Sequence, residues 1–189
     1  ERIGARMQAR RASELSAHAS DAGRAVRTFL FTDIVGSTSL IEVIGDEAWG
    51  ELLQWHDREL RSAFASHRGE EVNSTGDGFF VAFESAAEGL ECAVDIQRRL
   101  ARHRHEHGFA PTVRIGVHTA EASRKGRDYQ GRGVHVAARI GAAAGNAEIL
   151  VSSAAVNAAS PVRFGLSEPR ELALKGVDEP VEVRSVDWR

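Results

Sequence analysis

The amino-acid sequence predicts an α+β fold in a single domain. Segments rich in β-branched and aromatic residues alternate with segments whose apolar residues recur at helical spacing. Before the middle of the chain, two strand-like segments are separated only by a glycine turn, which is the pattern of a β-hairpin. With 189 residues, 42% of them hydrophobic and 27% charged, the chain is long enough for one sizeable core and lacks the composition of a disordered protein.

The first half of the chain predicts a strand, a helix and a hairpin, in that order. Residues 28–34 are β-branched and aromatic and indicate a buried strand, while residues 46–67 carry apolar side chains at helical spacing. Residues 70–75 and 79–83 flank a Gly-Asp-Gly turn. We therefore expect a hairpin with Asp77 at its tip.

The second half continues with a helix, a strand and a further helix. Ser85 is placed to cap a long helix, and residues 111–119 indicate the next strand. A helix over residues 133–144 and short strands near 148–151 and 181–186 follow. The order of the first six elements, β-α-β-β-α-β, is that of the ferredoxin-like, palm-like topology, in which an antiparallel sheet carries helices on one face.

Charge and cysteine content exclude several classes of protein. The net charge of −3 does not favour nucleic acid as a partner. We expect no membrane contact by this fragment, because no apolar run approaches the roughly 20 residues that span a bilayer. One cysteine, Cys92, provides no disulfide framework and indicates a reducing, cytoplasmic setting.

Residues 1–27 differ in composition from the rest of the chain. Six arginines against three acidic residues give them a local charge of +3. We interpret this segment as a linker or a signalling helix with a solvated basic surface, and residues 28–189 as the folded domain. Because the chain begins at Glu1 rather than at a methionine, we expect a piece of a longer protein with a regulatory or other domain fused to it.

Two aspartates lie where an apolar strand meets a glycine turn. They are Asp33, in the run FTDIVGST, and Asp77, in the run TGDGF. Two carboxylates at the rim of a sheet suit divalent metal ions, which take oxygen ligands and share them with substrate phosphates. Two such ions roughly 3.5–4 Å apart can stabilise the attacking and leaving oxygens of a phosphoryl displacement. The simpler alternative is that Asp33 caps the helix beginning near Ser37 and that Asp77 forms an ordinary hairpin turn.

Four motifs occur in order along most of the chain. They are 31–38 (FTDIVGST), 75–79 (TGDGF), 114–119 (RIGVHT), and 128–131 (DYQG) leading into 137–140 (AARI). Taken together they resemble the catalytic domain of the class III adenylyl and guanylyl cyclases, and the likeness runs from about residue 27 to about residue 186. The resemblance implies that Asp33, Asp77 and the carbonyl oxygen of Ile34 hold two divalent metal ions, Mg²⁺ or Mn²⁺.

The resemblance also assigns residues to the substrate. Backbone around Ser37 and Thr38, at a helix N-terminus, would meet the β- and γ-phosphates of a nucleotide, because exposed N–H groups and the helix dipole favour an anion there. Arg114 would add a phosphate contact. The matching positions for the purine-reading pair are Asn73 and Asp128.

The remaining roles imply a homodimer with shared active sites. In this family the partner chain supplies the purine-reading pair, a transition-state Asn/Arg pair and a lysine that binds the triphosphate. Arg139 matches the transition-state arginine, and Lys175 matches the lysine. Such cations are needed because negative charge moves onto the pyrophosphate as the ribose 3′-oxygen attacks the α-phosphorus. The implied reaction converts ATP to 3′,5′-cyclic AMP and pyrophosphate.

Two positions depart from the pattern of the family. Asn73 stands where adenylyl cyclases of this class generally carry a lysine, and its amide can donate or accept, so it discriminates purines poorly. Asp128 by itself favours ATP, because a carboxylate accepts from the adenine amino group and repels the guanine oxygen. His135 stands in place of the transition-state asparagine, and its ring N–H can donate as an amide does. The alternatives to an adenylyl cyclase are a cyclase of relaxed ATP/GTP selectivity and a catalytically weak or inactive nucleotide-binding or dimerisation module.

Overall fold

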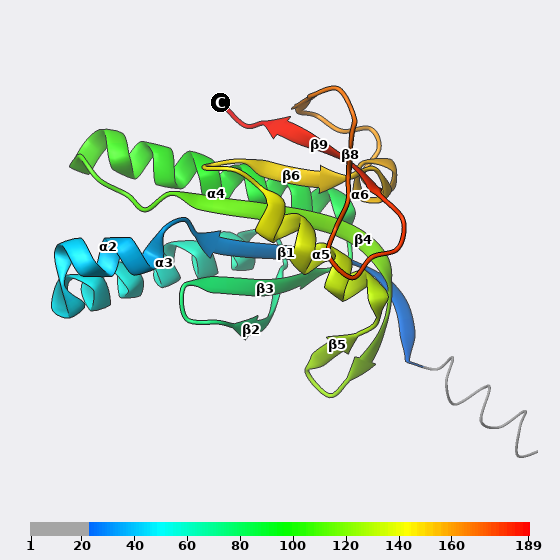
Figure 1. Cartoon of the computed structure of the whole chain (residues 1–189), viewed down its shortest axis with the longest axis horizontal. Helices are drawn as coiled ribbons and strands as arrows, with labels where there is room; N and C mark the ends of the chain where they lie inside the picture. Colours follow the sequence, from blue (N-terminus) through cyan, green and yellow to red (C-terminus); the bar gives the residue numbers. More distant parts are fainter. Residues whose placement is uncertain (1–22) are drawn as a thin grey trace, which may run out of the picture.

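The structure is a computed structural model that describes residues 23–189 (Figure 1). The elements of its first half are β1 (Arg24–Ile34), α2 (Ser37–Ile44), α3 (Asp46–Ser66), β2 (Glu70–Ser74), β3 (Gly78–Phe83), α4 (Ala86–His107) and β4 (Val113–Lys125). Those of its second half are β5 (Asp128–Gln130), α5 (Arg132–Ala143), β6 (Ile149–Ser152), α6 (Ser153–Ala158), β7 (Gly165–Leu166), β8 (Arg170–Leu172) and β9 (Val181–Asp187).

One nine-stranded sheet organises these elements. Its strand order is β2-β3-β1-β4-β6-β9-β7, with β5 paired to β4 and β8 paired to β9. β1 lies inside the sheet and pairs antiparallel with β3 on one side and β4 on the other, while β4 and β6 are parallel. The predicted α+β class is confirmed, and the predicted order of the first elements holds except that two helices, α2 and α3, stand between β1 and β2. Ser85 caps α4 by accepting from the N–H of Glu88 at 3.4 Å.

The structure adds detail at the start and in the second half of the chain. β1 begins at Arg24, four residues before the strand that the sequence predicted. The short elements β5, α6, β7 and β8 were not predicted at all. The linker or signalling helix expected over residues 1–27 falls almost wholly on residues outside the described part. Within residues 23–189, no helix is both long enough and apolar enough to cross a membrane.

α3 and α4 cover one face of the sheet, as expected for the first six elements, and α5 covers the opposite face. Leu30 of β1 belongs to the core cluster that α3 and α4 cover, whereas its neighbour Phe29 belongs to the cluster beneath α5. Figure 1 shows α5 in front of the sheet and α3 and α4 behind it. Alternate residues of β1 therefore face two cores, since successive side chains of a strand point to opposite faces.

The approach of α5 to the sheet depends on a pair of glycines. A Cβ atom placed on Gly116 of β4 would lie 2.4 Å from the Cα of Gly141 in α5. The backbones of strand and helix are therefore in direct contact, and no side chain fits between them. This contact fixes the position of α5 over β1 and β4.

A methyl group at Gly116 is expected to push α5 away from the sheet. Gly116→Ala should lower the free energy of unfolding by about 1–3 kcal/mol, the usual cost of overpacking a tight contact. Gly50→Ala in α3 is the control, because a Cβ there meets no atom within 4 Å and alanine favours a helix. Urea denaturation of both variants checks this, and equal stabilities would contradict it.

His118 on β4 has surroundings that disfavour its charged form. Its Nδ1 lies 2.7 Å from the hydroxyl oxygen of Ser152 on β6, and that oxygen also accepts from the N–H of Ala155 at 3.2 Å. Burial lowers the pKa of His118 from 6.5 to about 4. The folded domain therefore keeps this imidazole neutral over a pH range in which the unfolded chain protonates it.

The stability of the domain should fall as the pH drops from 6.5 to 4. Over that range the unfolded chain binds a proton at His118 that the folded chain does not. This lowers the free energy of unfolding by about 3 kcal/mol once the pH is below 4. His118→Asn removes the titration. Comparison of urea unfolding at pH 7 and pH 4 should show a larger loss for the parent than for the variant, and parallel losses would contradict the prediction.

Candidate active site

The two predicted metal-binding aspartates lie at the same end of two neighbouring strands. Asp33 is the second-last residue of β1, and its register partner is Gly78, the first residue of β3. Asp77 immediately precedes Gly78, and its carbonyl oxygen accepts from the N–H of Ile34 at 3.2 Å. Strand pairing thus brings both aspartates to one edge of the sheet, with Asp77 in the predicted turn.

This turn packs so closely on β1 that only glycine fits at its end. A Cβ atom on Gly78 would lie 2.3 Å from the carbonyl oxygen of Thr32. The buried hydroxyl of Thr32 accepts from the N–H of Phe79 at 3.0 Å and so ties β3 to β1 at this point. The role of Thr32 was not predictable from the sequence, because it depends on the register of two strands far apart along the chain.

Arg114 of β4 pairs with Asp33. The Asp33 Oδ2 accepts from Nε of Arg114 at 2.8 Å and from Nη2 at 2.5 Å. The third guanidinium nitrogen donates to the carbonyl oxygen of Ala142, in the last turn of α5, at 3.0 Å. Arg114, expected as a phosphate contact, therefore links Asp33 to α5 in this structure, and a phosphate contact by it stays a prediction.

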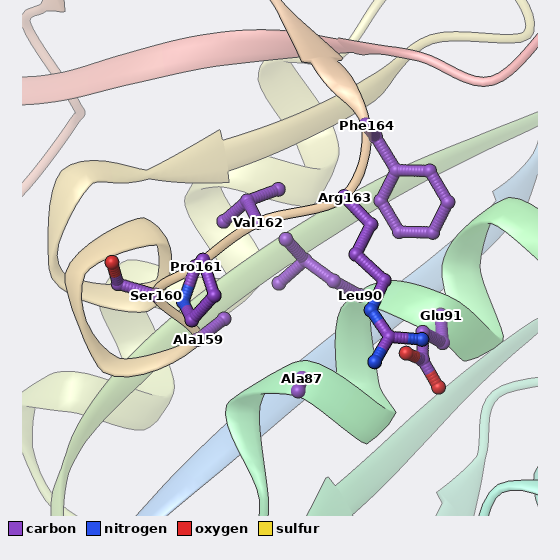
Figure 2. A pocket seen from close by; sticks show the side chains of 9 residues that line it. All are labelled: Ala87, Leu90, Glu91, Ala159, Ser160, Pro161, Val162, Arg163 and Phe164. Carbon is purple, nitrogen blue, oxygen red and sulfur yellow. The ribbon is translucent and has the colours of Figure 1, made fainter.

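A hollow of about 190 Å³ opens beside this pair. The residues that line it are Phe31, Thr32, Asp33 and Thr75 at the strand ends, Arg114 of β4, and Ala138, Gly141 and Ala142 of α5. Its walls thus come from the end of the sheet on one side and from α5 on the other. A larger hollow of about 240 Å³ lies between α4 and residues 159–164 (Figure 2), but none of the predicted site residues lines it.

The residues at the strand ends have the donor atoms that a hard divalent cation needs. Asp33 and Asp77 offer carboxylate oxygens, and Ile34 offers a carbonyl oxygen. Within residues 23–189, no group of three or more His, Cys, Asp or Glu side chains comes together as a ready-made metal site. An all-oxygen set with few protein ligands suits Mg²⁺ or Mn²⁺ that completes its shell with water and phosphate. The chemistry of the site therefore fits the expected metal ions.

The start of α2 is a free helix N-terminus next to these carboxylates. Gly36 precedes Ser37 in the left-handed conformation, with φ of +68°, and no side chain caps the first turn. The first backbone N–H groups of α2, around Ser37 and Thr38, are therefore available to an anion. The alternative that Asp33 serves as the helix cap is wrong, because no side chain caps this helix.

The remaining predicted residues lie on β2, β5, α5 and the turn after β8. Asn73 is on β2, Asp128 begins β5, and Lys175 lies in the turn after β8. His135 and Arg139 lie one turn apart on α5 and are exposed, because the helix buries Val136, Ala137 and Ile140 instead. Within the described chain we find no hydrogen bond or ion pair from any of these side chains to Asp33 or Asp77. These side chains therefore form no polar network with the two aspartates in the described chain.

Comparison with known proteins agrees with this geometry. A family model described as "Adenylate and Guanylate cyclase catalytic domain" matches residues 24–184. A receptor-type adenylate cyclase of Trypanosoma congolense is 28% identical over 82% of the chain, which covers 27% of that protein. The putative adenylate cyclase 3 of Rhizobium meliloti is 28% identical over 85% of the chain and 28% of its own length. The chain thus spans about a quarter of each of these relatives.

Solved structures show the same fold. The guanylyl cyclase Cya2 superposes with a TM-score of 0.78 at 25% identity, over 87% of this chain and 93% of that one. The adenylyl cyclase CyaB from P. aeruginosa also has a TM-score of 0.78, at 24% identity, over 87% of this chain and 94% of that one. With the match over residues 24–184, the chain belongs to the family of adenylate and guanylate cyclase catalytic domains, the class III nucleotidyl cyclases.

Proposed function

We propose that this domain converts ATP to 3′,5′-cyclic AMP and pyrophosphate. The observation that carries the proposal is the pairing of Asp33 with Gly78, which brings two aspartates to the edge of the sheet beside the uncapped start of α2. This is an arrangement for a metal-bound polyphosphate, because metal ligands and an anion-binding helix end adjoin. The curated relatives named above are adenylate cyclases, which supports ATP as the substrate.

In the proposed mechanism, each described residue has one task. Asp33, Asp77 and the Ile34 carbonyl would hold two Mg²⁺ or Mn²⁺ ions, which when bound stabilise charge on the attacking and leaving oxygens. The N–H groups around Ser37 and Thr38 bind the β- and γ-phosphates. The ribose 3′-hydroxyl gives its proton to water, its oxygen forms a bond to the α-phosphorus, and the bond from that phosphorus to the pyrophosphate breaks.

A second chain completes each site in this proposal. Arg139 and Lys175 would stabilise the negative charge that gathers on the pyrophosphate, and His135 would donate to the ribose or the α-phosphate. These side chains are exposed, and within the described chain none of them makes a hydrogen bond or ion pair with Asp33 or Asp77. A two-fold homodimer supplies them from the partner and creates two equivalent sites.

The purine would be read by Asp128 and Asn73. A carboxylate accepts from the adenine amino group and repels the guanine oxygen, and an amide donates to adenine N1. Both side chains are exposed. This favours ATP over GTP, although only Asp128 discriminates strongly.

Removal of either aspartate is expected to abolish cyclisation while the domain still folds. Asp33→Ala and Asp77→Ala should each lower the rate by ~10²–10³ or more, the usual cost of losing one electrostatic contact to the transition state. Glu84→Ala is a matched control, since this carboxylate is 85% exposed and pairs only with Arg27 in the described chain. Cyclic AMP formation with ATP and Mn²⁺ is the measurement.

The two aspartate variants should differ in stability. Asp33→Ala leaves Arg114 without its carboxylate partner, whereas Asp77 makes no ion pair within residues 23–189. A larger loss of thermal stability in Asp33→Ala would agree with the observed pair. Near-normal turnover in either variant would contradict the metal assignment.

A further inference from the structure

A polar cluster joins the two strands that carry the proposed purine-reading residues. β2 carries Asn73 and pairs with β3, whereas β5 carries Asp128 and pairs with β4, so the two strands share no ladder of backbone hydrogen bonds. Glu70, the first residue of β2, bridges them by accepting from Arg124 and Tyr129. We call these three side chains the Glu70 cluster.

The Glu70 cluster uses both oxygens of one carboxylate. Nη2 of Arg124 donates to Oε1 of Glu70 at 2.6 Å, and the hydroxyl of Tyr129 donates to Oε2 at 3.2 Å. Nη1 of Arg124 also lies 3.3 Å from the Tyr129 hydroxyl oxygen, and its guanidinium carbon lies 5.4 Å from the centre of that ring. The three groups thus contact one another pairwise, which restricts them more than a single ion pair would.

The cluster reaches Asp128 through the hairpin between β4 and β5. Tyr129 is 4% exposed and packs edge-on against Phe29 of β1, with ring centres 5.4 Å apart. Its backbone N–H donates to Oδ1 of Asp128 at 2.8 Å, and Nε of Arg124 closes the turn by donating to the carbonyl oxygen of Gly126 at 3.1 Å. The position of Tyr129 therefore sets the orientation of the Asp128 carboxylate.

Apolar packing anchors the base of this hairpin, because Tyr129 and Val72 of β2 contact the same buried cluster, and the Glu70 cluster adds the polar link to β2 in the described chain. β5 is only three residues long, and Figure 1 shows its hairpin extending away from the body of the sheet. Asp128 is exposed, and its carboxylate bonds only to the N–H of Tyr129 within the described chain. Without the Glu70 cluster, the hairpin would keep its apolar anchor but lose its polar link to the strand that carries Asn73.

We propose that Glu70 is a positioning residue for purine selection. Through Arg124 and Tyr129 it holds the hairpin that carries Asp128 against the strand that carries Asn73, and so fixes the acceptor that reads the adenine amino group. Glu70 itself does not touch the purine. The inference rests on the proposed function, in which Asp128 and Asn73 bind the base.

The chain offers a closely matched control one residue away. Glu71 lies on the same strand and binds Arg61 with both oxygens, at 2.8 and 3.0 Å. The side chains of Glu70 and Glu71 are 39% and 32% exposed, respectively. Glu70→Gln and Glu71→Gln therefore remove the same charge and the same kind of surface ion pair, but only the first loosens the hairpin.

The experiment compares ATP and GTP as substrates for these two variants. Glu70→Gln should raise the KM for ATP and lower the ATP-to-GTP ratio of kcat/KM by about two- to five-fold, as the loss of an exposed ion pair predicts, with kcat for ATP within about two-fold of the parent. Glu71→Gln should leave the ratio unchanged. Tyr129→Phe, which alters no charge, should shift the ratio in the same direction as Glu70→Gln.

Other results would overturn the inference. Equal shifts in Glu70→Gln and Glu71→Gln would assign the effect to charge alone, and a lower Tm with an unchanged ratio would make the cluster a structural clamp only. Asp128→Asn is the reference variant. If its ATP-to-GTP ratio of kcat/KM equals that of the parent, Asp128 does not read the purine, and the inference about Glu70 is wrong as well. If the parent forms no cyclic nucleotide, the proposed function is wrong. The Kd values of the same variants for ATP and GTP, measured by calorimetry, then test the role of the Glu70 cluster in nucleotide binding.

Discussion

The register between β1 and β3 is the constraint on which the site depends. Both faces of β1 are buried, so a slip of one residue would exchange Leu30 and Phe29 between two different cores. In the observed register Asp33 lies opposite Gly78, and a backbone contact there leaves no room for a side chain. The same packing that stabilises the fold therefore brings Asp33 and Asp77 to one edge of the sheet.

Arg114 connects this edge to the helix that carries the other proposed catalytic residues. It binds the Asp33 carboxylate and the carbonyl oxygen of Ala142, and the Gly116–Gly141 contact holds α5 against the same strand. The guanidinium of Arg114 neutralises the charge of the Asp33 carboxylate in this structure. The proposed metal-binding edge and the exposed face of α5 are thus both linked to one strand, β4.

Much of the fold was predictable because its signals are local. The Gly-Asp-Gly turn, the cap at Ser85 and the apolar periodicity of α3 and α4 lie within single segments. The side of the sheet that α5 covers was not predictable, because it depends on a contact between two glycines that are distant in sequence. The pairing of Arg114 with Asp33 and the Glu70 cluster were missed for the same reason. The identities of the proposed site residues came from their motifs, whereas their placement required the strand register.

Mixing two inactive variants tests the shared active site most directly. Asp33→Ala lacks the metal-binding half and Arg139→Ala lacks the transition-state half, so each alone should be inactive. If chains exchange freely, about half of the dimers are mixed and each has one intact site of two, which predicts roughly a quarter of the parental activity. A mixture that stays inactive although exchange of labelled chains is demonstrated would contradict the account, because Asp33 and Arg139 would then not act in one site across two chains.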